Sequence, residues 1–280
     1  MVEKAQDANT TAREAENGSS ADGETAGSFL RFILLVALAA LAFRSFAFSL
    51  FNIPSESMLP RLMNGDYLIA SKWPYGYTSN SLPFDIDLIP GRWFASAPER
   101  GDIVIFKHPV DGSDYVKRAI GLPGDVVELQ GGQVILNGEI LPLEKLPDLK
   151  VAVSANTGCA WGASREDDGT GRVFCRYKRF RESLPGGRSY EVLDFGATPQ
   201  DDYGPVRVPA GAMFLLGDNR DNSQDSRFTP EAGGGVGLVP QALLVGRAER
   251  IVFSTDGGAE CLRPGSWFPT TRWQRMGDGL

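Results

Sequence analysis

The sequence is poor in the residues that usually hold metals. It contains one histidine, His108, and three cysteines, Cys159, Cys175 and Cys261, with no Cys-x-x-Cys pair. A structural zinc site takes about four Cys or His ligands at short spacing, so we expect neither a metal nor any other cofactor. A disulfide between Cys159 and Cys175 fits the sequence, and three separate thiols fit it equally well, because spacing does not show proximity in space.

The chain also lacks an excess of positive charge. It has 28 Lys and Arg against 35 Asp and Glu, a net charge of -7, and no basic stripe. Proteins that bind nucleic acid usually carry such a stripe or patch, so we do not expect nucleic acid as a partner. The hydrophobic content of 42% is sufficient for a sizeable core, and 280 residues accommodate one large domain or two modest ones.

The first 28 residues lack large apolar side chains beyond Val2. They hold six acidic residues against Lys4 and Arg13, and they are otherwise rich in Ala, Thr, Ser and Gly. Such a segment cannot bury enough apolar surface to offset the entropy lost on folding. We therefore predict a disordered acidic tail over residues 1–28.

Only one long hydrophobic run is present, over residues 29–51. Its uninterrupted part, Phe32 to Phe43, has 12 residues, so a full span of about 20 requires Arg44 to lie near one membrane face. A run of this length also suits a cleaved signal peptide, and Ala40-Leu41-Ala42 resembles a cleavage site. Signal peptides begin with a short basic segment, however, so the acidic leader favours a retained transmembrane helix over residues 29–51. Arginines lie at both ends of this run, so charge does not show on which side of the membrane the rest of the chain lies.

The rest of the chain is typical of an antiparallel β protein. Short apolar or alternating runs are separated by turns, and 33 Gly and 18 Pro leave few convincing amphipathic helices. We expect strands at residues 66–70, 103–106, 115–120, 126–129, 134–136, 139–140, 213–216 and 243–253.

A charged segment with short strand-like pieces interrupts this pattern. It covers residues 141–203 and includes a strand-like run at residues 173–177. The predicted fold class is therefore mainly β: one transmembrane helix, then an antiparallel β domain over residues 52–140 and 204–280, with a smaller β-rich insertion over residues 141–203.

Ser57 follows the apolar run almost directly, in Ile53-Pro54-Ser55-Glu56-Ser57-Met58-Leu59-Pro60, which places a hydroxyl near a membrane surface. A serine is a weak nucleophile without a base. His108 precedes Pro109 at a strand end, where a polar residue that closes the strand is a better interpretation than a catalyst.

Lysine is the alternative base. Lys117 lies in the alternating run Tyr115-Val116-Lys117-Arg118-Ala119-Ile120, so Lys117 and Arg118 occupy opposite faces and one of them must point inward or across a groove. Burial would lower the pKa of a lysine and let it accept a proton. A solvent-facing strand lysine is the competing interpretation. The polar run Gly217 to Arg227 (GDNRDNSQDSR) is likewise either a solvated loop or a side-chain network that fixes local geometry.

Taken in order, these motifs resemble bacterial type I signal peptidases. IPSESM-x-P, GDIVIFKHP, YVKRAIGLPGD and GDNRDNS-x-DSR follow one predicted span and cover roughly residues 52–125 and 205–253. The resemblance implies a Ser/Lys dyad in which Ser57 is the nucleophile and Lys117 the general base. It further implies a group of supporting residues: Ser55 for the oxyanion hole, Ser223 to orient the lysine, and an Asp225–Arg227 ion pair. The residues implied to line the P1 and P3 pockets are Ile53, Met58, Leu62, Tyr115 and Val116.

The resemblance also implies an activity and a place in the cell. The family removes signal peptides from exported preproteins after small residues of the Ala-x-Ala type. We therefore expect a monomeric serine endopeptidase in contact with membrane lipid, anchored by a single pass in the bacterial inner membrane, with its catalytic domain on the extracytoplasmic side. Three alternatives stay open: a specialised pilus or conjugation maturation protease, a self-cleaving repressor, which the span disfavours, and a non-catalytic β domain that binds exported chains, which the intact Ser57 and Lys117 disfavour.

The chain departs from the family pattern at several positions. Glu56 stands where the family often has Gly, Arg61 stands where it often has Thr, and Phe228-Thr229-Pro230 replaces the usual Trp or Tyr-Trp-Gly after the polar run. Many Gram-negative relatives have a second span, whereas one is predicted here. These departures concern the rim of the site more than its chemistry.

Overall fold

The computed structural model describes residues 27–81, 91–260 and 263–280. The chain divides into two compact units, Met1–Ser45 and Phe46–Leu280. The N-terminal helix, Gly27–Phe46, is long and apolar enough to cross a membrane. Most of the predicted acidic tail lies outside the described residues, and its last two residues, Gly27 and Ser28, belong to this helix.

The helix ends before the predicted boundary at residue 51. The next residues form strand β1 (Phe48–Asn52), which pairs antiparallel with β2 (Asp66–Ser71), Phe48 lying opposite Ser71 and Asn52 opposite Tyr67. An apolar run does not distinguish a helix from a strand by hydrophobicity alone. Here the β-sheet provides backbone partners that end the helix.

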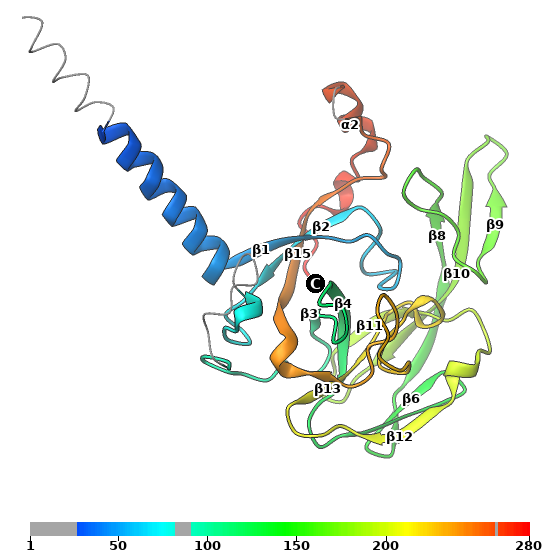
Figure 1. Ribbon diagram of the computed structural model, residues 1–280. Coiled ribbons are helices and arrows are strands. Elements are labelled where there is room, and N and C mark those ends of the chain that lie inside the picture. Colours follow the sequence, from blue (N-terminus) through cyan, green and yellow to red (C-terminus); the bar gives the residue numbers. More distant parts are fainter. Residues whose placement is uncertain (1–26, 82–90, 261–262) are drawn as a thin grey trace, which may run out of the picture. The chain divides into compact units, whose positions relative to one another are not determined.

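A seven-stranded antiparallel sheet forms the centre of the second unit (Figure 1). The spatial order is β1-β2-β15-β3-β4-β13-β14, so the last long strand lies between two early ones. The bounds of the other five strands are β3 (Ile103–Lys107), β4 (Asp114–Gly121), β13 (Ala212–Leu216), β14 (Val239–Pro240) and β15 (Leu244–Ser254).

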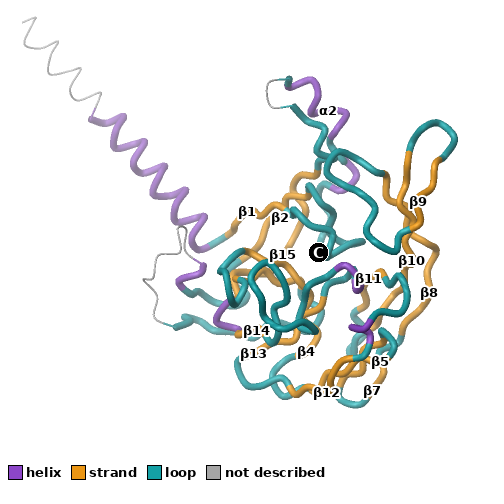
Figure 2. Tube along the Cα trace, turned by 45° about the vertical axis from the view of Figure 1, so that its right-hand side comes forward, coloured by secondary structure: helices purple, strands orange, loops and turns teal. Residues whose placement is uncertain are grey.

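Two four-stranded sheets accompany the central sheet. One has the order β12-β5-β6-β7, and Figure 2 shows β5, β7 and β12 gathered together. At its β6–β7 turn Asn137 and Gly138 have φ values of 53° and 85°, which suit the two central positions of a tight hairpin. The strands of this sheet are β5 (Val126–Gln130), β6 (Gln133–Leu136), β7 (Glu139–Ile140) and β12 (Tyr203–Arg207).

The other small sheet falls within the segment predicted as an insertion. Its order is β11-β10-β8, and β9 pairs with β10. It packs within the same compact unit as the central sheet. Its strands are β8 (Leu143–Ala152), β9 (Ser164–Asp167), β10 (Val173–Ser183) and β11 (Ser189–Leu193).

Helical structure in the second unit is short. The described part of this unit contains one α-helix, α2 (Trp267–Thr270), which follows the last strand, and single turns of 3-10 helix. The 3-10 turns are η1 (Ser79–Ser81), η3 (Pro199–Asp201), η4 (Arg220–Asn222), η5 (Gln241–Leu243), η6 (Pro264–Ser266) and η7 (Trp273–Arg275). The mainly β, antiparallel fold predicted from the sequence is confirmed.

A disulfide joins Cys159 to Cys175, which decides between the two possibilities that the sequence left open. Cys175 belongs to a buried cluster that also contains Leu59 from the segment just after Ser57. The sheet of β8–β11 therefore packs directly against the part of the chain that carries the candidate nucleophile. Cys261 lies outside the described residues.

Candidate active site

Ser57 and Lys117 meet in the structure. Lys117 Nζ lies 2.8 Å from Ser57 Oγ, within hydrogen-bond distance, and 3.1 Å from the carbonyl oxygen of Val116. Ser57 is 8% exposed and Lys117 is 3% exposed. The alternation of β4 directs Lys117 to this face, and a turn after Pro54 brings Ser57 to it, so two residues 60 positions apart in sequence become neighbours.

The environment of Lys117 favours the neutral amine. Burial lowers the pKa of its side chain from the usual 10.5 to about 8, although the carboxylates of Asp225 and Asp218 act in the opposite direction. The amine also lies 5.4 Å from the centre of the Tyr115 ring. A lysine in this state can accept a proton from a neighbouring hydroxyl at mildly alkaline pH.

Ser55 lies beside Ser57. Its Oγ is 3.3 Å from Ser57 Oγ, and its side chain lines the same cleft. A hydroxyl and the backbone N–H of Ser57 in this position are suitable donors for an oxyanion that forms next to Ser57. Glu56, between the two serines, does not line the cleft. It is half-buried, and burial raises the pKa of its carboxyl while the backbone N–H of Gly158 opposes the shift.

Asn219 holds the turn that carries Ser57. Its backbone N–H donates to the carbonyl of Ser57 at 3.1 Å, and its side-chain amide donates to the carbonyl of Glu56 at 3.0 Å. Asn219 is fully buried. The polar run from Gly217 to Arg227 is therefore a loop that positions Ser57 rather than a solvated loop.

Gly217 makes the closest approach between this polar run and Ser57. A Cβ built at Gly217 would lie 2.2 Å from Ser223 Oγ and 2.6 Å from the carbonyl oxygen of Ser57, so only glycine fits. Ser223 is buried in the site, but its Oγ has no hydrogen-bond partner among the described residues. The hydrogen bond between Ser223 and Lys117 that the resemblance implies is thus not formed in this structure, because the lysine amine turns to Ser57 and Val116 instead.

Asp225 and Arg227 form the implied ion pair. Arg227 Nε and Nη2 lie 2.9 and 3.0 Å from the two carboxylate oxygens, and the backbone N–H of Gly217 donates to Asp225 at 3.1 Å. Burial alone would raise the pKa of Asp225, but the charge and hydrogen bonds of Arg227 hold it below its usual value. The carboxylate stays ionised and anchors both ends of the polar run.

A second set of buried charges connects the polar run to β4 and to the sheet of β8–β11. Arg118 makes a two-bond pair with Asp218 at 2.7 and 2.6 Å, and Arg220 makes one with Glu182 at 3.0 and 2.6 Å. Tyr190 also hydrogen-bonds to Glu182. The sequence singled out neither Glu182 nor Tyr190 as a site residue, because no motif relates strands β10 and β11 to the polar run.

A cleft of about 320 Å³ opens beside the dyad. Ser57, Lys117 and Ser55 lie along it, together with the predicted pocket residues Ile53, Tyr115 and Val116. The complete lining is Phe51, Asn52, Ile53, Pro54, Ser55, Ser57, Ile105, Asp114, Tyr115, Val116, Lys117, Asn222, Gln224 and Gly233.

Met58 and Leu62, also predicted to line this pocket, do not line it. Both are fully buried in the apolar cluster that includes Ile53 and Ile105, which do line the cleft. The backbone turns after Ser57, and the N–H of Leu62 donates to the carbonyl of Met58 at 2.8 Å, so both side chains face the core. They support the floor of the cleft from below.

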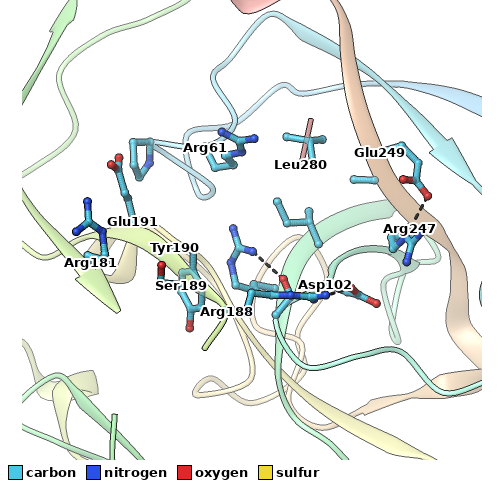
Figure 3. Close-up of a pocket in the computed structure, with 15 residues that line it drawn as sticks. Arg61, Asp102, Arg181, Arg188, Ser189, Tyr190, Glu191, Arg247, Glu249 and Leu280 are labelled. Carbon is cyan, nitrogen blue, oxygen red and sulfur yellow. Dashed lines mark hydrogen bonds and ion pairs between the residues drawn. The ribbon is translucent and has the colours of Figure 1, made fainter. Parts of the chain in front are cut away.

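A larger cavity, of about 650 Å³, lies elsewhere on the second unit. Figure 3 shows Arg61 and Leu280 along its upper side, with Arg188 and Tyr190 below them. Several of its arginines are neutralised by carboxylates: Arg188 contacts Asp102 at 3.0 Å, and Arg181, Arg247 and Arg118 are also paired. Neither Ser57 nor Lys117 lines it, so the smaller cleft is the candidate active site. In the part of the chain that the structure describes, no three His, Cys, Asp or Glu side chains gather as possible metal ligands.

The family model described as "Signal peptidase, peptidase S26" matches residues 26–253. The chain belongs to this family. Its relatives include the signal peptidase I of Rickettsia typhi, 37% identical over 240 residues that cover 81% of this chain and 80% of the relative. The signal peptidase I of Rickettsia prowazekii is 36% identical over 255 residues, which cover 87% and 84%.

A solved signal peptidase I from Enterococcus faecalis V583 is also similar, at 25% identity and a TM-score of 0.29, over 54% of this chain and 97% of that one. Membership of the family makes the protein a serine protease of the peptidase S26 type. With that membership, the one apolar helix found among the described residues marks a single-pass membrane protein.

Proposed function

We propose that the protein is a signal peptidase I that removes signal peptides from exported preproteins after small residues, with Ser57 as nucleophile and neutral Lys117 as general base. The observation that carries the proposal is the 2.8 Å approach of a buried lysine amine, with its pKa lowered to about 8, to a serine hydroxyl. A lysine kept only for its charge would be paired with a carboxylate instead.

The first chemical step follows from this geometry. Ser57 Oγ attacks the carbonyl carbon of the residue before the scissile bond, and its proton passes to Lys117 Nζ. The negative charge that develops on the carbonyl oxygen is stabilised by the backbone N–H of Ser57 and the hydroxyl of Ser55, which lies 3.3 Å from the nucleophile. Asn219 keeps this turn in place through the carbonyls of Glu56 and Ser57.

In the remaining steps Lys117 again donates and accepts protons. The Lys117 ammonium gives the serine proton to the leaving amine, which frees the mature chain and leaves the signal peptide as an ester on Ser57. A water molecule then attacks this ester while Lys117, neutral again, accepts the water proton. Ser57 regains its hydrogen as the ester breaks, so no cofactor is needed. The Asp225–Arg227 pair supports the polar run beside the lysine.

The cleft suits an extended peptide. The pairs between β13 and β4 end at Arg118, while Asp114, Tyr115 and Val116 continue along the cleft. A substrate that adds to β4 as a strand would place alternate side chains, P1 and P3, against the same wall. Ile53 and Val116 keep this wall shallow and apolar, which favours alanine.

The disulfide supports an extracytoplasmic place for the catalytic unit. Disulfides persist in oxidising compartments and are rare in the bacterial cytoplasm, and Cys159–Cys175 is formed within the fold. We therefore assign the catalytic unit to the outer side of the inner membrane, where the signal peptides of exported chains emerge and membrane lipid is adjacent. We expect the enzyme to act as a monomer, and residues 141–203 to form an insertion within its catalytic domain.

The test is cleavage of a preprotein with Ala at P3 and P1 by the full chain in lipid vesicles, with the new N-terminus identified by mass spectrometry. Wild type should cut after P1, and Ser57→Ala should not. Ala→Phe at P1 should reduce kcat/KM far more than Ala→Phe at P2, whose side chain points away from the cleft. Equal tolerance at P1 and P2 contradicts the pocket assignment. Cleavage of a pilus or conjugation precursor but of no generic preprotein favours the specialised alternative.

A further inference from the structure

His108, which the sequence placed outside the chemistry, is almost fully buried at the end of β3, with 1% of its surface exposed. Its Nδ1 accepts hydrogen bonds from the backbone N–H groups of Val110 at 3.2 Å and Asp111 at 3.4 Å. The hydrogen of a neutral ring therefore lies on Nε2, which donates to the carbonyl of Gly235 at 3.2 Å. His108 thus links the β3–β4 turn to a distant loop.

That loop, the glycine loop (Gly233–Gly235), forms part of the cleft wall through Gly233. Asp111, in the same β3–β4 turn, accepts a hydrogen bond from the backbone N–H of Gly233 at 2.7 Å. At the other end Gly235 fits tightly, because a Cβ there would lie 2.4 Å from Phe228 Cβ. The glycine loop is therefore held by two side chains of one turn, His108 and Asp111.

Asp111 is suited to this role because it is itself fixed. Its carboxylate accepts the hydroxyl of Ser113 at 2.5 Å and the backbone N–H of Ser113 at 2.9 Å. These hydrogen bonds hold the pKa of Asp111 at about 2, with a further contribution from the N–H of Gly233. The carboxylate therefore stays charged at every pH at which the lysine base operates.

The same histidine contacts a second wall of the cleft. The centres of the His108 and Tyr115 rings are 4.7 Å apart. The Tyr115 ring in turn lies near Lys117, whose Nζ is 5.4 Å from the ring centre. Tyr115 lines the cleft. His108 thus touches one cleft wall through Tyr115 and another through the glycine loop, without reaching Ser57.

We infer that His108 and Asp111 are positioning residues of the substrate cleft, which hold the glycine loop and Tyr115 at the spacing that an extended peptide requires. The inference rests on the proposed function and adds the residues that set substrate affinity. Because neither side chain touches the reacting atoms, their loss should weaken substrate binding and leave the chemical step almost unchanged.

The variants separate the two contacts of the histidine. His108→Phe keeps an aromatic ring beside Tyr115 but removes the hydrogen bond to Gly235. His108→Gln retains an N–H donor near the position of Nε2. Asp111→Ala removes the bond to Gly233 at an exposed site. Asp168→Ala is the matched control, because Asp168 accepts Thr170 in a similar turn of the β9–β10 hairpin, away from the cleft.

Two readouts are needed: kcat and KM for an Ala-x-Ala preprotein, and the Kd of the corresponding peptide for the same substitutions combined with Ser57→Ala. We expect KM and Kd to rise about tenfold in His108→Phe and Asp111→Ala, the effect of one lost hydrogen bond at the upper end of its usual range. His108→Gln should recover most of the loss, Asp168→Ala should match wild type, and kcat should change by less than about twofold.

Unchanged KM and Kd in both His108→Phe and Asp111→Ala would overturn the inference, as would a fall in kcat at constant KM. If His108→Phe does not fold, the exposed Asp111→Ala decides alone. If the wild type cleaves no preprotein, the proposed function fails, while the Kd values in the Ser57→Ala background still decide whether these residues shape a peptide-binding cleft.

Discussion

Lys117 and Arg118 are consecutive residues of β4, both are buried, and they have opposite kinds of partner. The lysine amine lies against the Ser57 hydroxyl at 2.8 Å, whereas the arginine makes a two-bond pair with the Asp218 carboxylate. Arginine keeps its charge under almost all conditions, so pairing makes it a fixed structural cation. The lysine forms no salt bridge within the described part of the chain, and burial lowers its pKa to about 8.

The first prediction concerns this dyad. Ser57→Ala and Lys117→Ala should each abolish preprotein cleavage while the thermal unfolding temperature stays close to that of wild type. The two residues act as one unit, so the double variant should be no worse than either single variant. Lys150→Ala, which removes a lysine that is exposed on β8, serves as the control and should be fully active. Full activity in Lys117→Ala would remove the dyad.

Ser55 should contribute less than the dyad. Ser55→Ala removes one candidate oxyanion donor and leaves the N–H of Ser57, so we expect kcat to fall by roughly 10²–10³-fold. Single-turnover kinetics with a preprotein would measure this loss. Wild-type kcat would remove only the oxyanion assignment and would leave the nucleophile and base intact.

The pH profile should report Lys117 directly. Only the neutral amine accepts the serine proton, so kcat/KM should rise about tenfold per pH unit below the lysine pKa and level off above it. The midpoint should lie near 8, the value to which burial lowers this pKa. A profile that is flat from about pH 5 to 10 is incompatible with a lysine base of ordinary or lowered pKa.

Asp225 gives this profile a second test. Its carboxylate raises the pKa of Lys117, because a nearby negative charge favours the ammonium form. Asp225→Asn should therefore move the acidic limb to lower pH, even if the maximal rate falls through loss of the Arg227 pair. Glu144→Gln, at an exposed pair with Arg181, is the control and should leave the midpoint where it is. A shift to higher pH would contradict the proposed electrostatics.

Gly217→Ala tests whether the polar run positions the nucleophile. The new methyl group would meet Ser223 Oγ and the carbonyl of Ser57 at less than 3 Å, so the turn must move. Misplacement of a reacting group by about 1 Å costs on the order of 10²-fold in rate, and we expect a loss of this size in kcat. Gly265→Ala, where nothing lies within 4 Å, should behave as wild type. A fully active Gly217→Ala enzyme would show that the polar run can accommodate the methyl group without displacing Ser57.

The disulfide should stabilise the inserted sheet. Its two cysteines are 16 positions apart, and a loop of about this length gains roughly 3 kcal/mol from cross-linking. Replacing both Cys159 and Cys175 by Ser should lower the denaturation midpoint of the oxidised protein by a corresponding amount. Reduction of wild type with dithiothreitol should give the same midpoint as the double variant. Equal stability of the oxidised wild type and the double variant would show that the disulfide does not stabilise the fold.

Much of the fold followed from local patterns. The alternating runs and Gly-rich turns located the strands of the β5–β6–β7 meander and of β3 and β4, because period-two alternation and turn residues act within a few positions. The helix boundary was placed too late. Phe48–Asn52 is as apolar as the residues before it, and only its pairing with β2 makes it a strand.

The candidate site, like the fold, was predicted only in part from the sequence. The resemblance brought Ser57 and Lys117 together, and the structure places them in contact. It did not show that Met58 and Leu62 turn into the core, since this depends on the path of the backbone after Ser57. The sequence predicted that one of Lys117 and Arg118 points inward or across a groove, and in the structure both are buried, because β4 is covered on both faces. Asn219 and Glu182 stabilise the site through contacts with residues far away in the sequence, and no local pattern predicts such contacts.

The position of β15 has a consequence for the newly made protein. This strand, Leu244–Ser254, lies between β2 and β3, which are encoded far earlier, so the central sheet stays open until nearly the whole catalytic unit has been synthesised. The polar run that fixes Ser57 follows β13 and also arrives late. A nascent or truncated chain thus carries both members of the dyad without the scaffold that aligns them. Both β15 and the polar run must therefore be synthesised before Ser57 and Lys117 can take the positions that they have in the folded protein.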